Sequence, residues 1–168
     1  QMIIKFPLYF NPGKEDRCIH MYLPNDYYER DERYPVVYMF DGQNVFFNED
    51  ATYGTCWGMK EFLDGWWKKL IVVGVQCAPD QRRMSEYCPF DMNVSFFGDV
   101  QGRGEETMQW LVNSLKPHID KPYRTYKRRE CTAIAGSSMG GMMSLYGVIH
   151  YNTVFSKAAV VSPAIGNA

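Results

Sequence analysis

Apolar residues follow two alternating patterns along this chain. Continuous apolar runs, rich in β-branched and aromatic residues, predict buried strands at 35–40 and 70–75, and two further strands are predicted at 131–135 and 158–161. Apolar residues spaced three or four positions apart predict helices over 59–70, from about 105 to 119, and over 140–149. Such alternation is typical of an α/β fold, in which helices cover both faces of a mainly parallel sheet.

The pattern is less regular in four places. Residues 2–10 and 18–23 read as two short strands around the turn-forming residues 11–13, which together predict a hairpin. Gly65 lies inside the first predicted helix and costs about 1 kcal/mol relative to alanine. Pro117 is expected to loosen the end of the second helix. Residues 76–104 show no period and predict a long loop.

Length and composition predict one globular domain over residues 1–168. The sequence has no internal repeat or linker-like segment, and its net charge of -1 leaves no basic excess for nucleic acid or an anionic membrane. It contains no apolar run of the ~18 residues that a membrane-spanning helix needs, and no basic segment followed by a signal core. These features predict a soluble, cytoplasmic protein. Five cysteines without a C-x-x-C pair predict neither a zinc site nor a disulfide framework.

The chemistry-bearing motif is Gly136-Ser137-Ser138-Met139-Gly140, which matches G-x-S-x-G between a predicted strand and a predicted helix. This is the context of the nucleophile elbow, a turn so tight that a Cβ at either glycine would collide with neighbouring backbone. Ser138 is therefore the candidate nucleophile, at the N-terminus of a helix whose dipole favours developing negative charge. Ser137 is expected to point away.

A glycine-rich turn between a strand and a helix can also cradle a phosphate. The sequence has neither G-x-x-x-x-G-K-[ST] nor, at this turn, G-x-G-x-x-G, so it predicts no nucleotide cofactor, and no cofactor or metal of another kind is indicated.

An acyl-transfer nucleophile needs two N–H donors for the oxyanion of its tetrahedral intermediate. Met139, the residue after the nucleophile, supplies the first by position. The second comes from the loop after the third strand, which here begins Asp41-Gly42-Gln43, so the backbone of Gln43 is the candidate. Asp41-Gly42 is equally compatible with an ordinary turn. Because the donor is a backbone N–H, the Gln43 side chain is expected to matter little.

Four segments together resemble one family: PVVYMFDGQNVF, RRMSEYCP, LKPHIDKPYRT and AIAGSSMGGMMSLY. They look like the putative-esterase family of the α/β-hydrolase superfamily, which includes esterase D-like enzymes, feruloyl and siderophore esterases and mycolyltransferases. The similarity runs from about Tyr34 to Pro163. It implies that an oxyanion-hole amide follows Asp41 and Gly42, in agreement with the order of elements.

The resemblance also implies a loop beside the acyl pocket. Its R-x-x-x-E-Y-x-P pattern falls on Arg82 or Arg83, followed by Glu86, Tyr87 and Pro89. An Arg–Glu pair that orders this loop is the favoured interpretation, and direct substrate contact by Arg83, Glu86 and Tyr87 is the alternative.

The remaining triad members are not found in the sequence. In an α/β-hydrolase an acid and then a histidine follow the serine, yet no acidic residue follows Ser138, and the sole later histidine, His150, lies more than ~15 Å along the predicted helix. His20 and His118 are expected to be structural or surface residues. We therefore expect a fold truncated after the sixth strand, whose open edge leads to aggregation, to a homo-oligomer, or to cover by further chain.

The sequence thus predicts a serine esterase that acts on a small-molecule ester through an acyl-enzyme on Ser138, although these 168 residues alone should be nearly inactive. Aromatic residues such as Phe46, Trp57 and Tyr87 are compatible with an acylated sugar or a phenolic ester. Two alternatives stay open: a non-catalytic module that binds a ligand in the same cleft, and an acyltransferase.

Overall fold

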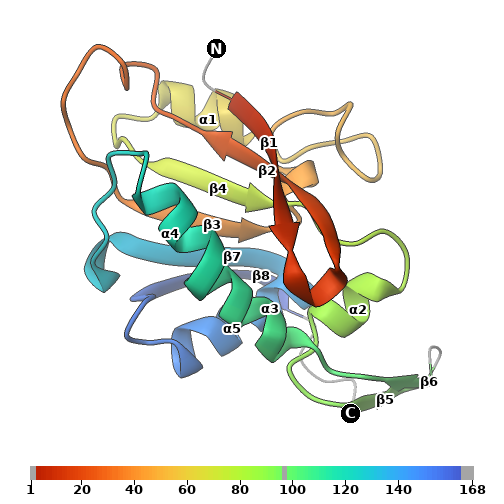
Figure 1. The fold of residues 1–168 in the computed structure, drawn as a ribbon. Coiled ribbons are helices and arrows are strands. Elements are labelled where there is room, and N and C mark those ends of the chain that lie inside the picture. The colour runs from red at the N-terminus through yellow and green to blue at the C-terminus, as the bar shows by residue number, and fades with distance from the viewer. Residues whose placement is uncertain (1–2, 96–97, 164–168) are drawn as a thin grey trace.

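Six strands form one sheet in the computed structural model, which describes residues 3–95 and 98–163. The strand order is β1-β2-β4-β3-β7-β8 (Figure 1). The β3, β4, β7 and β8 strands run parallel, whereas β2 is antiparallel to both β1 and β4. The mainly parallel sheet predicted from the sequence is confirmed. The strands are β1 (Ile3–Phe10), β2 (Glu15–Tyr22), β3 (Val36–Phe40), β4 (Ile71–Val75), β7 (Thr132–Ser138) and β8 (Lys157–Pro163).

The N-terminal hairpin is also confirmed, and its second strand begins earlier than predicted. The β1 and β2 strands pair from Ile3 opposite Tyr22 to Phe10 opposite Glu15, and a 3-10 turn over Asn11–Gly13 joins them. The first positions of β2 are charged, so the apolar pattern could not reveal them.

Helices cover both faces of the sheet (Figure 1). Side chains alternate along each strand, so Tyr38 and Phe40 of β3 enter one core, and Met39 enters the other. The first core is closed by α3 (Gly104–Trp110), a π-helical turn (Leu111–Leu115), α4 (Lys116–Asp120) and α5 (Met139–His150). The second core is closed by α1 (Met59–Gly65).

The first helix is shorter than the prediction of 59–70. It ends at Gly65, because Trp66 takes an extended conformation (φ -90°, ψ 139°). Phe62 and Trp67, two of the apolar residues whose spacing predicted this helix, are 57% and 79% exposed. Only Leu63 of this helix is fully buried, so the apolar spacing overestimated how much of the segment packs on the sheet.

The second predicted helix runs past Pro117 without breaking. The π-helical turn ends at Leu115, two residues before Pro117, which has no N–H to donate to the preceding turn. Ile119, in α4, is fully buried.

The segment predicted as a long loop carries structure of its own. It contains the short helix α2 (Arg82–Glu86) and a hairpin of β5 (Met92–Val94) and β6 (Gly98–Val100). Both are too short for a period to emerge in the sequence. Over the described residues, no helix combines the length and the hydropathy that crossing a membrane requires.

Candidate active site

Ser138 lies at the junction of β7 and α5, and its backbone has a conformation that is rare for any residue other than glycine. Its backbone has φ 54° and ψ -121°, and its side chain is exposed. A non-glycine residue at such a positive φ costs about 1–3 kcal/mol and persists only where the surroundings impose it. The sharp turn ends the strand and starts the helix at once, which leaves Ser138 at the N-cap position and Met139 as the first helical residue.

Two glycines make this turn sterically feasible. A Cβ on Gly136 would lie 2.4 Å from the carbonyl oxygen of Gly140, far inside ordinary van der Waals contact. A Cβ on Gly140 would lie 3.0 Å from Cβ of Phe40, at the end of β3. The first glycine therefore lets the start of α5 fold back on β7, and the second brings the turn close to the adjacent strand.

The turn after β3 begins with a second unusual backbone. Asp41 is left-handed (φ 57°, ψ 50°), and a 3-10 turn (Gly42–Asn44) follows. The N–H groups of Asn44 and Val45 close this turn on the carbonyls of Asp41 and Gly42, at 3.0 Å and 3.3 Å, so the turn does not use the N–H of Gln43. That N–H is thus available at the carboxyl end of β3.

The Gln43 side chain has a structural role that the sequence did not reveal. Its Oε1 accepts the backbone N–H of Cys77 at 3.2 Å, and its Nε2 donates to Sγ of Cys77 at 3.1 Å and to Oγ1 of Thr52 at 3.2 Å. Gln43 is buried. The expectation that this side chain matters little is therefore revised, since it ties the turn to the residues after β4.

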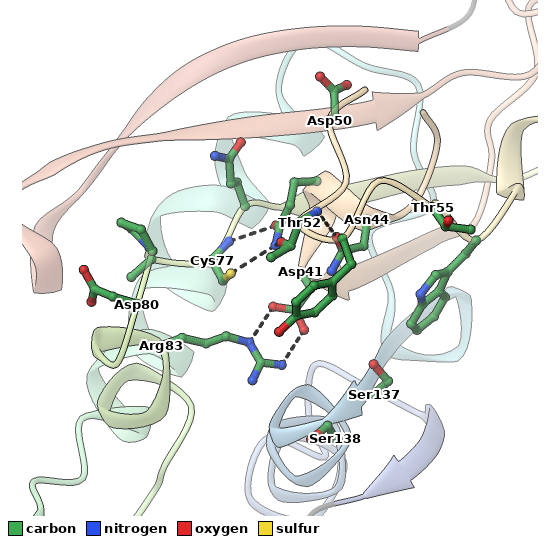
Figure 2. Close-up of a pocket in the computed structure, with 16 residues that line it drawn as sticks. Asp41, Asn44, Asp50, Thr52, Thr55, Cys77, Asp80, Arg83, Ser137 and Ser138 are labelled. Atoms are coloured by element: carbon green, nitrogen blue, oxygen red, sulfur yellow. Dashed lines mark hydrogen bonds and ion pairs between the residues drawn. The ribbon is translucent and has the colours of Figure 1, made fainter. Parts of the chain in front are cut away.

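An ion pair joins this turn to α2. Nε and Nη2 of Arg83 donate to the two carboxylate oxygens of Asp41 at 2.8 Å and 2.6 Å, which is a bidentate arrangement (Figure 2). The hydrogen bond to Asp41 raises the pKa of Arg83 further above its usual value, so the guanidinium stays charged. The Arg83 guanidinium also lies 5.0 Å from the ring centroid of Tyr87.

The predicted pairing within the loop is wrong. Glu86 does not pair with Arg82 or Arg83: its carboxylate accepts two hydrogen bonds from Arg17, at 2.8 Å and 2.6 Å, in a buried pair. Arg82 instead reaches Glu15 and Asp80 at the surface. The family pattern suggested a pair within the loop, whereas the hairpin brings Arg17 to α2 from far away in the chain.

A pocket of about 770 Å³ connects these parts (Figure 2). Ser138, Gln43 and Arg83 all line it, whereas Glu86 and Tyr87, two of the proposed substrate contacts, are buried away from its wall. Ser137 also lines the pocket, although we expected it to point away. The wall further includes Asp41, Asn44, Asp50, Thr52, Tyr53, Thr55, Trp57, Gln76, Cys77, Ala78, Pro79 and Asp80.

None of the three histidines, all within the described part of the chain, lines this pocket. His118 and His150 are exposed, and His150 packs on Tyr146 at 4.4 Å between ring centroids. His20 is buried, with Nε2 3.1 Å from Oε1 of Gln76. Desolvation lowers its pKa and favours the neutral ring. The described residues also contain no cluster of three His, Cys, Asp or Glu side chains placed to hold a metal ion.

Sequence reasoning missed Cys77 and Arg17 as parts of the site and its support. Cys77 lines the pocket beside Gln43, and burial raises the pKa of its thiol to about 11. It is therefore protonated at neutral pH and acts as a hydrogen-bond partner rather than a nucleophile. Neither residue belongs to a motif, so nothing in the sequence distinguished them.

A mainly parallel sheet with helices on both faces, and a strained serine between a strand and a helix, are the features of the α/β-hydrolase fold. The chain belongs to the family described as "Putative esterase", whose model matches residues 12–167, and the resemblance seen in the sequence is confirmed.

Three known proteins illustrate the similarity. The chain is 31% identical to Esterase Rv1288 of Mycobacterium tuberculosis over 92% of its own length and 30% of that protein. It is 23% identical to the uncharacterized protein YbbA of Bacillus subtilis over 88% of its length and 56% of that protein. In structure it matches an IroE-like serine hydrolase from Shewanella oneidensis with a TM-score of 0.74 and 24% identity, covering 93% of this chain and 49% of the other. The chain thus spans between about a third and somewhat more than half of the proteins it matches.

Proposed function

We propose that this chain carries the nucleophile and the oxyanion hole of a carboxylic-ester hydrolase that works through an acyl-enzyme on Ser138. The observation that carries the proposal is the backbone of Ser138, at φ 54° and ψ -121°. A serine held in this strained turn, exposed in a pocket, has the geometry that presents a hydroxyl to an acyl carbonyl. A serine in an ordinary structural turn would need no such strain.

In the proposed reaction, Oγ of Ser138 attacks the carbonyl carbon while its proton passes to a base. The carbonyl π electrons move to oxygen, and the N–H groups of Met139 and Gln43 stabilise that oxyanion. When the tetrahedral intermediate collapses, the bond to the alcohol oxygen breaks and the alcohol leaves with a proton from the base. Water then attacks the acyl-enzyme in the same way, releasing the acid and regenerating Ser138.

The base belongs, in this proposal, to a part of the protein outside these 168 residues. No acidic residue follows Ser138 in the sequence, and no histidine lines the pocket among the described residues. In this fold the acid and the histidine follow the serine, and both YbbA and Esterase Rv1288 are longer than the part that this chain matches.

The pocket wall favours a small ester with hydrogen-bonding groups. Trp57 and Tyr53 are large aromatic side chains that remain 42% and 94% exposed, and Thr52, Thr55 and Asn44 add polar atoms to the same pocket. Aromatic faces beside hydroxyl and amide groups suit the ring of an acylated sugar or of a phenolic ester.

A fluorophosphonate probe tests the proposal on the whole protein. We expect the probe to label the wild type and Ser137→Ala, and to leave Ser138→Ala unlabelled, because these probes react with an activated serine beside an oxyanion hole. Hydrolysis of p-nitrophenyl acetate should follow the same order. Labelling that persists in Ser138→Ala would refute the assignment, and loss of labelling in Ser137→Ala alone would move the nucleophile by one residue.

The 168 residues on their own should hydrolyse p-nitrophenyl acetate close to background. Without a base the Ser138 hydroxyl stays protonated, and an oxyanion hole with substrate binding accounts for only about 10³- to 10⁴-fold over water. Equal, Ser138-dependent rates in this chain and in the whole protein would mean that His20 or His118 has to be reconsidered as the base.

A further inference from the structure

We propose that Arg83 is a positioning residue for the oxyanion hole: through its ion pair with Asp41 it holds the turn that aims the Gln43 N–H at the substrate. This inference rests on the proposed function, because it assigns a role within the same site. It concerns how the second oxyanion donor is kept in place before the substrate arrives.

The turn needs such a restraint because its backbone is unfavourable. Asp41 has φ 57°, a conformation that costs a non-glycine residue about 1–2 kcal/mol, although aspartate tolerates it better than most residues. The next residue packs closely against β4, since a Cβ on Gly42 would lie 2.3 Å from the carbonyl carbon of Gly74. If Asp41 relaxed to negative φ, the peptide groups after it would rotate, and the Gln43 N–H would rotate with them.

Hydrogen bonds from Arg83 and to Tyr87 hold Asp41 in this conformation. Arg83 binds both carboxylate oxygens, at 2.8 Å and 2.6 Å. The backbone N–H of Asp41 donates to the hydroxyl of Tyr87 at 3.1 Å. Tyr87 also packs against the Arg83 guanidinium, 5.0 Å from its ring centroid, so the two residues support each other. Both the carboxylate and the N–H of Asp41 are therefore fixed from the α2 side of the pocket.

The segment that presents Arg83 is itself anchored. Glu86, one turn further along α2, forms the buried pair with Arg17 of β2, and the backbone N–H of Tyr87 donates to the carbonyl of Arg83 at 3.0 Å. The restraint on Asp41 thus comes from a fixed element rather than from a free loop, as preorganisation of an oxyanion hole requires.

Arg83 also lines the pocket, so a direct contact with substrate is the competing role. The two roles differ in kinetics. A residue that binds substrate equally in ground and transition states changes KM, whereas one that aims an oxyanion donor changes kcat, because the oxyanion exists only near the transition state.

The test compares Arg83→Lys and Arg83→Gln with the matched control Arg82→Gln in the whole protein. Arg82 is the adjacent arginine, pairs at the surface with Glu15 and does not line the pocket. We expect kcat of Arg83→Gln to fall about 10- to 100-fold with KM within about 3-fold, below the about 10²- to 10³-fold of losing a donor outright. Arg83→Lys should recover only part of the loss, because lysine cannot make the bidentate pair. Arg82→Gln should match the wild type.

A boronic acid that forms a tetrahedral adduct with Ser138 gives a second readout. Its inhibition constant should weaken in Arg83→Gln by the same factor as kcat/KM falls, because the adduct occupies the oxyanion hole. A merely destabilised protein would lower the active fraction without changing the inhibition constant of the molecules that remain folded.

A double-mutant cycle with Asp41→Asn decides whether Arg83 acts through Asp41. Asparagine tolerates the left-handed backbone, so this variant removes the charge and not the turn. The double variant should lose no more kcat than the worse single variant. Additive losses, an unchanged kcat in Arg83→Gln, or a raised KM alone would each overturn this inference. If the wild type itself shows no Ser138-dependent hydrolysis, the proposed function has failed and this inference falls with it.

Discussion

Gly136→Ala is the sharpest steric test of the elbow at Ser138. The substitution adds one methyl group at a position where the added carbon would lie 2.4 Å from the carbonyl oxygen of Gly140 and 2.5 Å from its carbonyl carbon. Both atoms are backbone, and they belong to the first turn of α5. No side-chain rotation can relieve such a contact, so the helix start has to move away from β7.

The expected loss of stability follows from how close these atoms would lie. Atoms in ordinary contact lie about 3.5 Å apart, so the helix start would have to shift by about 1 Å. Overpacking of a buried site costs about 1–3 kcal/mol, and we expect the upper end because the displaced group is hydrogen-bonded backbone. The same shift moves the Met139 N–H relative to Ser138, so kcat should fall by about 10²-fold or more, in line with the sensitivity of catalysis to displacements of about 1 Å.

Urea unfolding and fluorophosphonate labelling of the whole protein measure the two effects. Gly65→Ala is the matched control, because a Cβ there meets nothing within 4 Å, and it should leave labelling unchanged. Gly147→Ala is intermediate: its Cβ would lie 3.0 Å from the flexible ends of Ile134 and Met108, which can shift. If Gly136→Ala were as stable and as reactive as Gly65→Ala, the close approach of α5 to β7 would not be what builds the elbow.

Three further predictions address the neighbouring parts. Gln43→Pro removes the proposed donor N–H and should lower kcat about 10²- to 10³-fold. Gln43→Ala should lower kcat less but measurably, since three hydrogen bonds to Cys77 and Thr52 are lost. Equal losses in the two variants would show that the side chain, and not the N–H, is what matters. Glu86→Gln should lower the free energy of unfolding by about 1.5–3 kcal/mol, because it removes the buried partner charge of Arg17 and leaves only Glu15, at 2.8 Å, to compensate the guanidinium. A change below about 0.5 kcal/mol in urea unfolding would contradict this. For His20, burial lowers the pKa of the ring in the folded state. The unfolded chain therefore takes up a proton first as the pH falls below about 6.5. The free energy of unfolding should then decrease towards the lowered pKa with a slope of at most about 1.4 kcal/mol per pH unit. Urea unfolding at about pH 7.5 and about pH 5.5 should show this loss in the wild type and not in His20→Gln; an equal loss in both would assign it to other groups.

The elements that the sequence predicted well are those whose pattern is local. The buried strands β3 and β4 are continuous apolar runs, and the helix from Met139 to His150 follows a glycine-rich turn. Each of these elements can be identified from a few consecutive residues. The α1 helix was overestimated because Phe62 and Trp67 fit a helical stripe but face solvent. The spacing of apolar residues shows which side chains would lie on one face of a helix, but not whether that face packs on the sheet.

In the site, too, the residues that were predicted belong to a local motif. Ser138 and its flanking glycines form a contiguous motif, and the steric reason for each glycine follows from the motif itself. Glu86 and Tyr87 were grouped with Arg83 as substrate contacts because the family pattern R-x-x-x-E-Y-x-P implies one loop beside the acyl pocket. On a helical turn, however, neighbours point in different directions, and only Arg83 reaches the pocket wall.

The contacts that hold the turn after β3 could not be predicted, because the residues that make them are separated by long stretches of chain. Arg83 lies 42 residues from Asp41, and Arg17 lies 69 residues from Glu86. Either arginine could, by charge alone, pair with any of the 19 acidic residues. The choice is made by the sheet: β2 runs antiparallel beside β4, which brings Arg17 to α2, and β3 ends beside β4, which brings Asp41 to the same side. If this turn carries the second oxyanion donor, as proposed, activity should fall through substitutions at Arg83 or Arg17, neither of which belongs to a motif.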